Sequence, residues 1–454
     1  MSVAAPIEAA QRERPVGSLE WLLWMFRMNI IVAARIRGPL DAATLRQALD
    51  AMQRRHPLLN VRVACEGRDR FHFRAASAPI PLTVVDDAPS AWEAAAEREM
   101  NHPFRLDDAP AMRCVLVGND PADQMLLLVY SHGIGDGRSG IFMLRDLLDA
   151  AARILAGGNG PADRKPLLHA QERYLLGNTG RFTAWRYYIR FTAQGVLASM
   201  RNKRKRKARE QRPAASLTTG EFQSALLTVE GEPELVEALL RRAREEKATL
   251  HGALCAAHLQ AFAAQIAAGE AASVCFASSI NLQTGVESPV TDDVMLFISG
   301  VDATCDVDPR APLWDLARHS AQVIRERIQR DDFIIGGVMT VESMTRLRRW
   351  MPPTDEGFRK LMKMVIKSSP LDTVVSSISD LGIPSAYGPL QIDGCYGLSN
   401  NPSVALMSLG IVSGGRLFWT FVYHRDAISR EWIEHMSADA LERLRAAVRN
   451  GEGR

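Results

Sequence analysis

Apolar runs of strand length and amphipathic stretches of helix length follow one another through the first third of the chain. Strands are predicted at residues 28–36, 61–64, 71–73, 112–117 and 125–130, and helices at residues 41–55, 91–100 and 141–156. In the first helix, Leu45, Ala48, Leu49 and Met52 recur at the spacing of one buried face, and Asp41 is a residue type that caps a helix start. The two strands at 112–117 and 125–130 are expected to pair across a turn. This pattern predicts a mixed α/β unit.

The second half of the chain repeats this outline. Strands are predicted at residues 222–229, 274–280, 294–301, 404–412 and 416–423, and helices at residues 233–247, 249–268, 313–330 and from Ser429 onward. A hairpin is expected around Gly414 and Gly415, because glycine supports tight turns. Residues 331–364, interrupted by Pro352 and Pro353, are expected to form a mobile lid over an acyl pocket. The whole pattern predicts two similar α/β halves with a cleft between them.

Composition supports a globular protein and indicates in which cellular compartment it resides. The 454 residues are 47% hydrophobic and 24% charged, which is enough for two or three domains with cores. No apolar run has the length of a membrane span, and residues 1–14 lack the layout of a signal peptide. The six cysteines stand singly, without C-x-x-C spacing. We therefore expect a cytoplasmic protein without structural metal or disulfides.

One loop carries the clearest chemical signal. Residues 131–137, SHGIGDG, lie between the predicted strand at 125–130 and the predicted helix at 141–156. Three glycines let this backbone turn sharply and let another molecule come close, and His132 stands at the strand end. Because imidazole titrates near pH ~6.5, His132 can take a proton from an attacking hydroxyl or amine and return it to a leaving thiol. Asp136 is expected to pair with an arginine and hold the loop, since an unpaired buried carboxylate is costly.

The sequence H-x-x-x-D-G in this position resembles the signature of the CoA-dependent acyltransferase superfamily. That superfamily includes condensation domains of nonribosomal peptide synthetases, alcohol acyltransferases and polyketide-associated acyltransferases. Residues 55–59 (RHPLL), 103–113 (PFRLDDAPAMR) and 375–382 (VSSISDLG) are similar to three further segments of the family. Ser131 stands where many condensation domains have a first histidine, and Gln283 where many relatives have arginine. These departures concern the subfamily.

The resemblance implies a fold and a division of the chain. The fold is α/β (α+β), with two chloramphenicol-acetyltransferase-like halves in a V-shaped pseudo-dimer around a central active-site tunnel. We expect a flexible leader at residues 1–15, a first half at 16–160, a connector at 161–220 and a second half at 221–454. The resemblance also implies that His132 is catalytic, while Asp136 and Gly137 belong to the structural part of the motif.

Other readings of the same residues are weaker. Residues 135–140 match G-x-G-x-x-G between a strand and a helix, but no second strand ending in an acid follows, as a dinucleotide fold requires. No serine-hydrolase elbow is present, and His132 with Asp136 gives two metal ligands where a site needs three or four. His251 and His258 stand among Ala and Leu, which favours core or surface histidines over ligands. A noncatalytic relative that only recruits partners is the remaining alternative for His132.

A basic run separates the two halves. Residues 201–212 hold eight basic residues and one acid, so they carry more net positive charge than the +3 of the whole chain. Such local basicity argues against a nucleic-acid binder, whose basic face spreads over the domain. The run is either a solvated linker or a docking site for an acidic acyl carrier protein, CoA phosphates or a peripheral membrane surface. The candidates for donor docking are Lys203, Arg204, Lys205, Arg206 and Lys207.

These observations predict a stand-alone acyltransferase of lipid or secondary metabolism. A thioester co-substrate, acyl-CoA or carrier-bound phosphopantetheine, donates an acyl group to a small-molecule alcohol, with no tightly bound cofactor. An amide-forming condensation enzyme with an amine acceptor and a noncatalytic docking protein stay as alternatives. The candidates for oxyanion or substrate contacts are Ser131, Gly133, Asn281, Ser376 and Ser377.

Overall fold

Two six-stranded sheets and a small third sheet form the frame of the computed structural model. The structure describes residues 13–67, 70–160, 163–176, 185–186, 189–190, 223–282, 292–330, 354–368 and 371–449. The basic run 201–212, most of the connector 161–220 and residues 331–353 of the expected lid lie outside these ranges. No helix among the described residues is long and apolar enough to cross a membrane.

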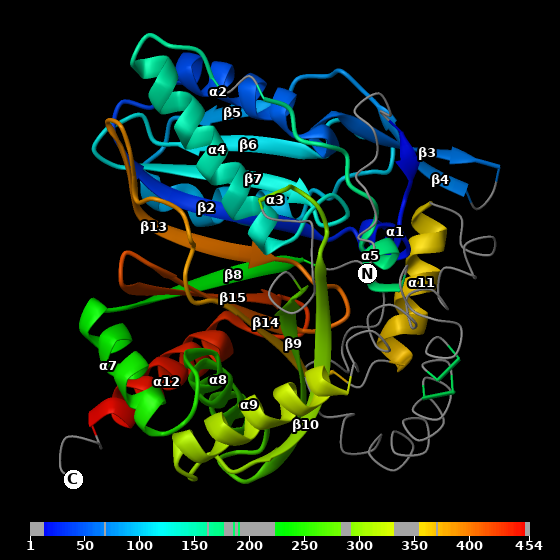
Figure 1. Ribbon diagram of the computed structural model, residues 1–454. Coiled ribbons are helices and arrows are strands. Elements are labelled where there is room, and N and C mark those ends of the chain that lie inside the picture. Colours follow the sequence, from blue (N-terminus) through cyan, green and yellow to red (C-terminus); the bar gives the residue numbers. More distant parts are fainter. Residues whose placement is uncertain are drawn as a thin grey trace.

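The first large sheet has the strand order β12-β13-β2-β7-β6-β5. Its strands are β2 Asn29–Arg37, β5 Leu82–Val85, β6 Met112–Val117, β7 Gln124–Ser131, β12 Ala386–Tyr387 and β13 Leu390–Ser399. Strands β6 and β7 pair antiparallel, as the sequence predicted. Helices α2 (Ala42–Arg55) and α4 (Gly137–Leu155) pack against each other above this sheet (Figure 1).

The second large sheet has the order β10-β9-β11-β14-β15-β8. Its strands are β8 Ser224–Gly231, β9 Ala272–Asn281, β10 Ile298–Val307, β11 Thr373–Ile378, β14 Leu406–Ser413 and β15 Arg416–His424. Helices α7 (Pro233–Glu245), α8 (Leu250–Ile266), α9 (Leu313–Gln329) and α12 (Arg430–Arg449) cover it (Figure 1). The hairpin β14–β15 turns at Gly414 and Gly415, both with positive φ, which confirms that prediction. The strand predicted at 294–301 instead begins at Ile298, because residues 292–297 cross to the first half.

Shorter elements complete the frame. Strands β1 (Arg14–Pro15), β3 (Val61–Glu66) and β4 (Arg70–Ala75) form the small sheet. Helix α1 (Ser18–Met25) follows β1, α3 (Trp92–Met100) contacts strands of both large sheets, and α5 (Gln171–Leu176) and α11 (Asp355–Ser368) lie on the side of α1 (Figure 1). Two short 3-10 turns are η1 Pro57–Asn60 and η2 Pro89–Ala91.

Strand β13 joins the two halves of the molecule. It comes late in the chain but pairs antiparallel with β2 of the first sheet, and it also contacts β14 and β15 of the second. A Cβ at Gly397 would lie 2.2 Å from Leu409 Cδ2, and one at Gly394 would lie 2.7 Å from Phe418 Cε1. Glycine at these positions therefore allows the second sheet to approach closely, which brings residues of both sheets to one place.

All six cysteines are free thiols. Cys65 is exposed and the other five are buried. The described residues contain no group of three or more metal-binding side chains placed to hold an ion.

Candidate active site

The loop after β7 is built so that His132 stands at a fixed position. The His132 backbone N–H donates to the Met28 carbonyl over 2.8 Å, and the Ile134 N–H donates to the Ser131 carbonyl over 3.1 Å. All residues from Ser131 to Asp136 are buried. Gly133 is required here, because a Cβ at this position would lie 2.5 Å from Trp24 Cε3. Helix α1 therefore supports the loop from behind.

The hydrogen bonds of His132 define its protonation. Nδ1 lies 3.0 Å from the Gly135 carbonyl oxygen, and a carbonyl can only accept, so Nδ1 carries the proton. Nε2 is then the basic nitrogen, and no described residue forms a hydrogen bond with it. Burial lowers the pKa of His132 below its usual 6.5, although the charge of Asp136 acts in the opposite direction. The imidazole is therefore neutral near pH 7, with a free lone pair on Nε2.

Asp136 is the N-cap of α4. Its Oδ1 accepts from the Ser139 N–H over 2.9 Å and from the Ser139 hydroxyl over 3.1 Å, while Oδ2 accepts from the Phe297 N–H over 3.0 Å. The expectation that Asp136 pairs with an arginine is wrong, since no described arginine is among its partners. The Ser139 N–H at the helix start and the Phe297 N–H of the segment before β10 satisfy the buried carboxylate instead. The helix begins at Gly137, four residues before the predicted start, because of this cap.

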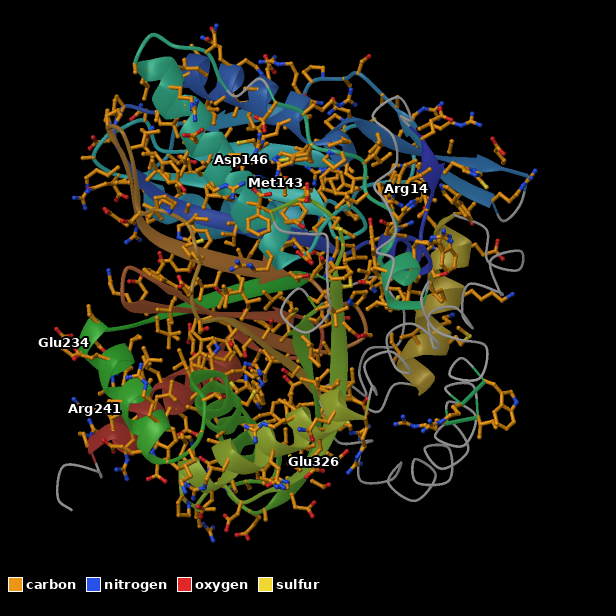
Figure 2. All side chains as sticks on the ribbon, viewed as in Figure 1. Arg14, Met143, Asp146, Glu234, Arg241 and Glu326 are labelled. Atoms are coloured by element: carbon orange, nitrogen blue, oxygen red, sulfur yellow. The ribbon has the colours of Figure 1, made fainter. Side chains whose placement is uncertain are left out.

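The arginine and histidine of the RHPLL segment bind a different acid. Arg55 Nε and His56 Nε2 both lie 2.8 Å from Oδ2 of Asp146, on α4. Burial disfavours the Asp146 charge, but hydrogen bonds from His56 and Arg145 hold the pKa of this carboxyl well below its usual range. Figure 2 shows Asp146 beside Met143 in the upper half of the molecule. The segment therefore fixes α2 to α4, which carries the His loop.

A cavity of about 340 Å³ lies between the halves, with His132 in its wall. Asp136 and Gly137 also line it, and a Cβ at Gly137 would make only an ordinary contact, at 3.7 Å from Ile378 Cδ1. Ser376 and Ser377 of β11 line the same cavity, so the structure brings these two predicted contacts to His132. Apolar lining residues come from both sheets and include Ile30, Val32, Val374, Met407, Leu409 and Ile411.

The other predicted contacts lie elsewhere. The Ser131 hydroxyl accepts from the Gly133 N–H over 3.2 Å, and the structure does not place Ser131 or Gly133 in the cavity wall. Asn281 is the last residue of β9, paired with Ile298, and its side chain is outside the described part of the structure. The docking candidates Lys203, Arg204, Lys205, Arg206 and Lys207 are also outside it.

Several polar residues of the cavity were not predicted from the sequence. Arg138 donates from Nη1 to the carbonyls of Asp380 and Leu381, over 3.2 and 3.1 Å, and so joins the start of α4 to the loop after β11. Ser279, Ser399 and Asn401 also line the cavity. The polar run from Ser399 to Asn401, directly after an apolar stretch, was the available signal for two of them.

Comparison with known proteins identifies the family. The condensation-domain model matches residues 27–265, more than half of the chain. The model of the phthiocerol/phthiodiolone dimycocerosyl transferase C-terminus matches residues 223–352. One component of the linear gramicidin synthase of Brevibacillus parabrevis is 27% identical over 207 residues, which cover 41% of this chain and 4% of that protein. Phosphinothricin tripeptide synthetase PhsC of Streptomyces viridochromogenes is 32% identical over 126 residues, which cover 26% of this chain and 12% of that protein. The matched regions thus span only a small part of these curated relatives.

Solved structures show the same fold over nearly the whole chain. Polyketide synthase associated protein 5 from Mycobacterium tuberculosis has a TM-score of 0.62 at 14% identity, covering 98% of this chain and 99% of that one. The first condensation domain of the calcium-dependent antibiotic synthetase, with a substrate analogue, has a TM-score of 0.65 at 14% identity and 96% coverage of both chains. The expected fold of two chloramphenicol-acetyltransferase-like halves is confirmed. The chain belongs to the condensation-domain family, within the CoA-dependent acyltransferase superfamily.

Proposed function

We propose that this chain is an acyltransferase that moves an acyl group from a thioester donor, acyl-CoA or an acyl carrier protein, to a small-molecule hydroxyl group. One observation carries the proposal: the ring of His132 lines the cavity between the halves with Nδ1 bound to the Gly135 carbonyl. This bond assigns the proton to Nδ1 and keeps Nε2 as the base. A neutral imidazole fixed in this way is suited to general base catalysis.

The proposed reaction needs only one proton carrier. His132 Nε2 accepts the hydroxyl proton while the acceptor oxygen forms a bond to the thioester carbonyl carbon, and the carbonyl oxygen becomes an oxyanion. The C–S bond of this tetrahedral intermediate then breaks, and Nε2 returns the proton to the leaving thiolate. Thioester and alcohol become ester and thiol, and the histidine is restored.

Ser376 is the first candidate for a donor to the oxyanion. It lines the cavity, and its hydroxyl forms no hydrogen bond to another described residue. Residues two apart on a strand face the same side, and Val374 and Ile378 line the cavity with it. Its hydroxyl is therefore available to a substrate oxygen. Ser377 has its hydroxyl in a hydrogen bond to His251, over 2.8 Å.

Two acceptor groups, a hydroxyl and an amine, are candidates for this reaction. The match to the dimycocerosyl transferase C-terminus and the likeness to a polyketide synthase associated protein favour an ester product. The condensation-domain match and the gramicidin synthase similarity favour an amide product, which we keep as the second candidate. Both reactions use the same base and release the same thiol.

Product analysis with matched acceptors tests the proposal. The purified chain receives one acyl-CoA and one pair of acceptors that differ only in a hydroxyl or an amino group, and mass spectrometry identifies the product. Ester formation supports the proposal, and amide formation supports the second candidate. No product and no thiol release from a panel of CoA and carrier donors would support a noncatalytic docking protein.

The basic run provides a separate test of the donor. The same acyl group is offered on CoA and on a carrier protein, to the intact chain and to a chain lacking residues 201–212. If Lys203, Arg204, Lys205, Arg206 and Lys207 dock the donor, the deletion lowers turnover from the carrier. CoA turnover that survives the deletion assigns the run to a linker.

A further inference from the structure

Strands β9 and β11 are parallel neighbours that part at the wall of the cavity. Their backbone pairing joins residues 276–278 to residues 373–375 and stops there, while β9 continues against β10 and β11 continues against β14. Ser279 and Ser376, the first residues beyond the last pair, both line the cavity with His132. The cavity therefore reaches the gap that opens between the two strands.

His251 bridges the strands at the point where their pairing ends. It lies in the first turn of α8, with Nδ1 2.8 Å from the Ser377 hydroxyl oxygen of β11 and Nε2 2.7 Å from the Ser278 hydroxyl oxygen of β9. Ser278 belongs to the last backbone pair, and Ser377 lies two residues beyond it and lines the cavity. Side-chain hydrogen bonds thus continue the connection where the backbone ladder stops.

This bridge stays intact at physiological pH. Burial lowers the pKa of His251 to about 4, so the ring is neutral near pH 7. A neutral imidazole has one donor and one acceptor nitrogen, so one serine hydroxyl accepts from the ring and the other donates to it. Cys255, one helical turn later, has its sulfur 3.4 Å from Nε2 and so contacts the imidazole from the side of α8.

His258 makes the same kind of bridge away from the cavity. It lies seven residues further along α8, with Nε2 2.8 Å from the Thr373 hydroxyl oxygen and Nδ1 2.9 Å from the Ser408 hydroxyl oxygen. Thr373 is backbone-paired with β9, and Ser408 is paired with β11, so this bridge spans a closed part of the sheet. His258 is therefore a matched control for His251.

We propose that His251 is a positioning residue that sets the width of the gap between β9 and β11, and that this gap holds the amide-bearing arm of the thioester donor. The inference rests on the proposed acyl transfer. Parted strand edges offer backbone N–H and C=O groups, which an extended chain with amides can pair with. Ser279 and Ser376 add hydroxyls at the same place, whereas Leu409 and Ile411 give the rest of the cavity an apolar wall suited to an acyl chain.

Two donors with the same acyl group separate this role from a structural one. An acyl-pantetheine thioester carries two amides, and an acyl thioester of 2-mercaptoethanol carries none. We expect His251→Ala to lower the ratio of kcat/KM for the first donor to that for the second by about tenfold, mainly through KM, as one or two hydrogen bonds are lost. His258→Ala should lose stability but keep the ratio. His251→Gln, which keeps a donor and an acceptor, should recover part of it.

The ratio of kcat/KM for the two donors distinguishes a positioning role of His251 from a purely structural one. Equal ratios in the wild type, His251→Ala and His258→Ala would overturn the inference and leave the acyl-transfer proposal standing. Ser377→Ala is the second variant if His251→Ala does not fold, with the same expected direction. If the wild type turns over neither donor, calorimetric binding of free pantetheine decides the inference, and thiol release from the panel of CoA and carrier donors separately decides the acyl-transfer proposal. Binding weakened by His251→Ala but not by His258→Ala supports the gap, and equal binding overturns it.

Discussion

Asp136 of the first half accepts a hydrogen bond from the backbone N–H of Phe297 in the segment that crosses from the second half, over 3.0 Å. The same carboxylate caps α4 through Ser139. One side chain thus fixes both the start of the helix after the His loop and the contact between the halves. A change at Asp136 should therefore alter the protein's stability and the placement of His132 together.

Replacing Asp136 by Asn tests this double role. The carboxamide offers one acceptor oxygen where the carboxylate offers two, so a buried N–H loses its partner. We expect a loss of about 1–3 kcal/mol in the free energy of unfolding, measured with urea, and slower thiol release. Asp149→Asn is the control, since Asp149 is a partly exposed α4 residue paired with Arg153, and its loss should cost less than about 1 kcal/mol. Equal stability of Asp136→Asn and wild type would contradict the assigned role.

The pH dependence of activity follows from the burial of His132. Its pKa is lowered below the usual 6.5, and the base form is the neutral ring. The value of kcat/KM should be independent of pH around pH 7 and should fall as the pH falls, with a midpoint below 6.5. Initial rates of thiol release, measured from about pH 4.5 to about pH 8, provide the profile. An acid-limb midpoint above the usual histidine value would argue against His132 as this base.

Stability should also fall on the acid side. Burial lowers the pKa of His251 to about 4 and that of His258 to about 3, whereas both titrate near 6.5 when exposed. Between these values the unfolded chain binds protons that the folded chain does not, so the free energy of unfolding decreases as the pH drops. The slope is about 1.4 kcal/mol per pH unit for each such proton. Urea unfolding at several pH values should show a smaller slope for His258→Gln, and an unchanged slope would refute this explanation.

Gly133→Ala tests the support of the His loop by α1. The added Cβ would lie 2.5 Å from Trp24 Cε3 and 3.0 Å from the Glu20 carbonyl oxygen, so the loop or the helix must move. We expect a loss of about 1–3 kcal/mol in the free energy of unfolding and a drop in kcat. Gly300→Ala is the matched control, because its Cβ would meet only the Ser278 carbonyl oxygen, at 3.6 Å. A Gly133→Ala protein with wild-type kcat would show that the position of the loop does not depend on this contact.

The sequence revealed the elements that depend on local pattern. The strand, loop and helix around His132 were predictable because apolar runs, glycines and a capping acid are neighbours in the chain. Helix α8 was predictable for the same reason, with Thr249 as its cap. The glycine-rich loop and its histidine indicated the family.

Features that join distant segments were not predictable in this way. The partner of Asp136 is a backbone N–H 161 residues away. Every residue type except proline has such a group, so the sequence does not indicate this partner, and an arginine was expected instead. Strand β13 was not predicted, because Gly394 and Gly397 interrupt its apolar run. Glycine is needed at both positions because the second sheet approaches the strand closely there. The bridge of His251 to Ser278 and Ser377 joins three elements, and local periodicity carries no trace of it.

The most direct test of acyl transfer is the rate of thiol release from an acyl thioester by the wild type and by His132→Ala. Circular dichroism and urea unfolding first establish that the variant folds. Loss of the general base should slow release by about 10²–10⁴-fold at pH 7 with little change in donor binding. An equal rate in the folded variant would contradict the central claim that His132 Nε2 moves the proton.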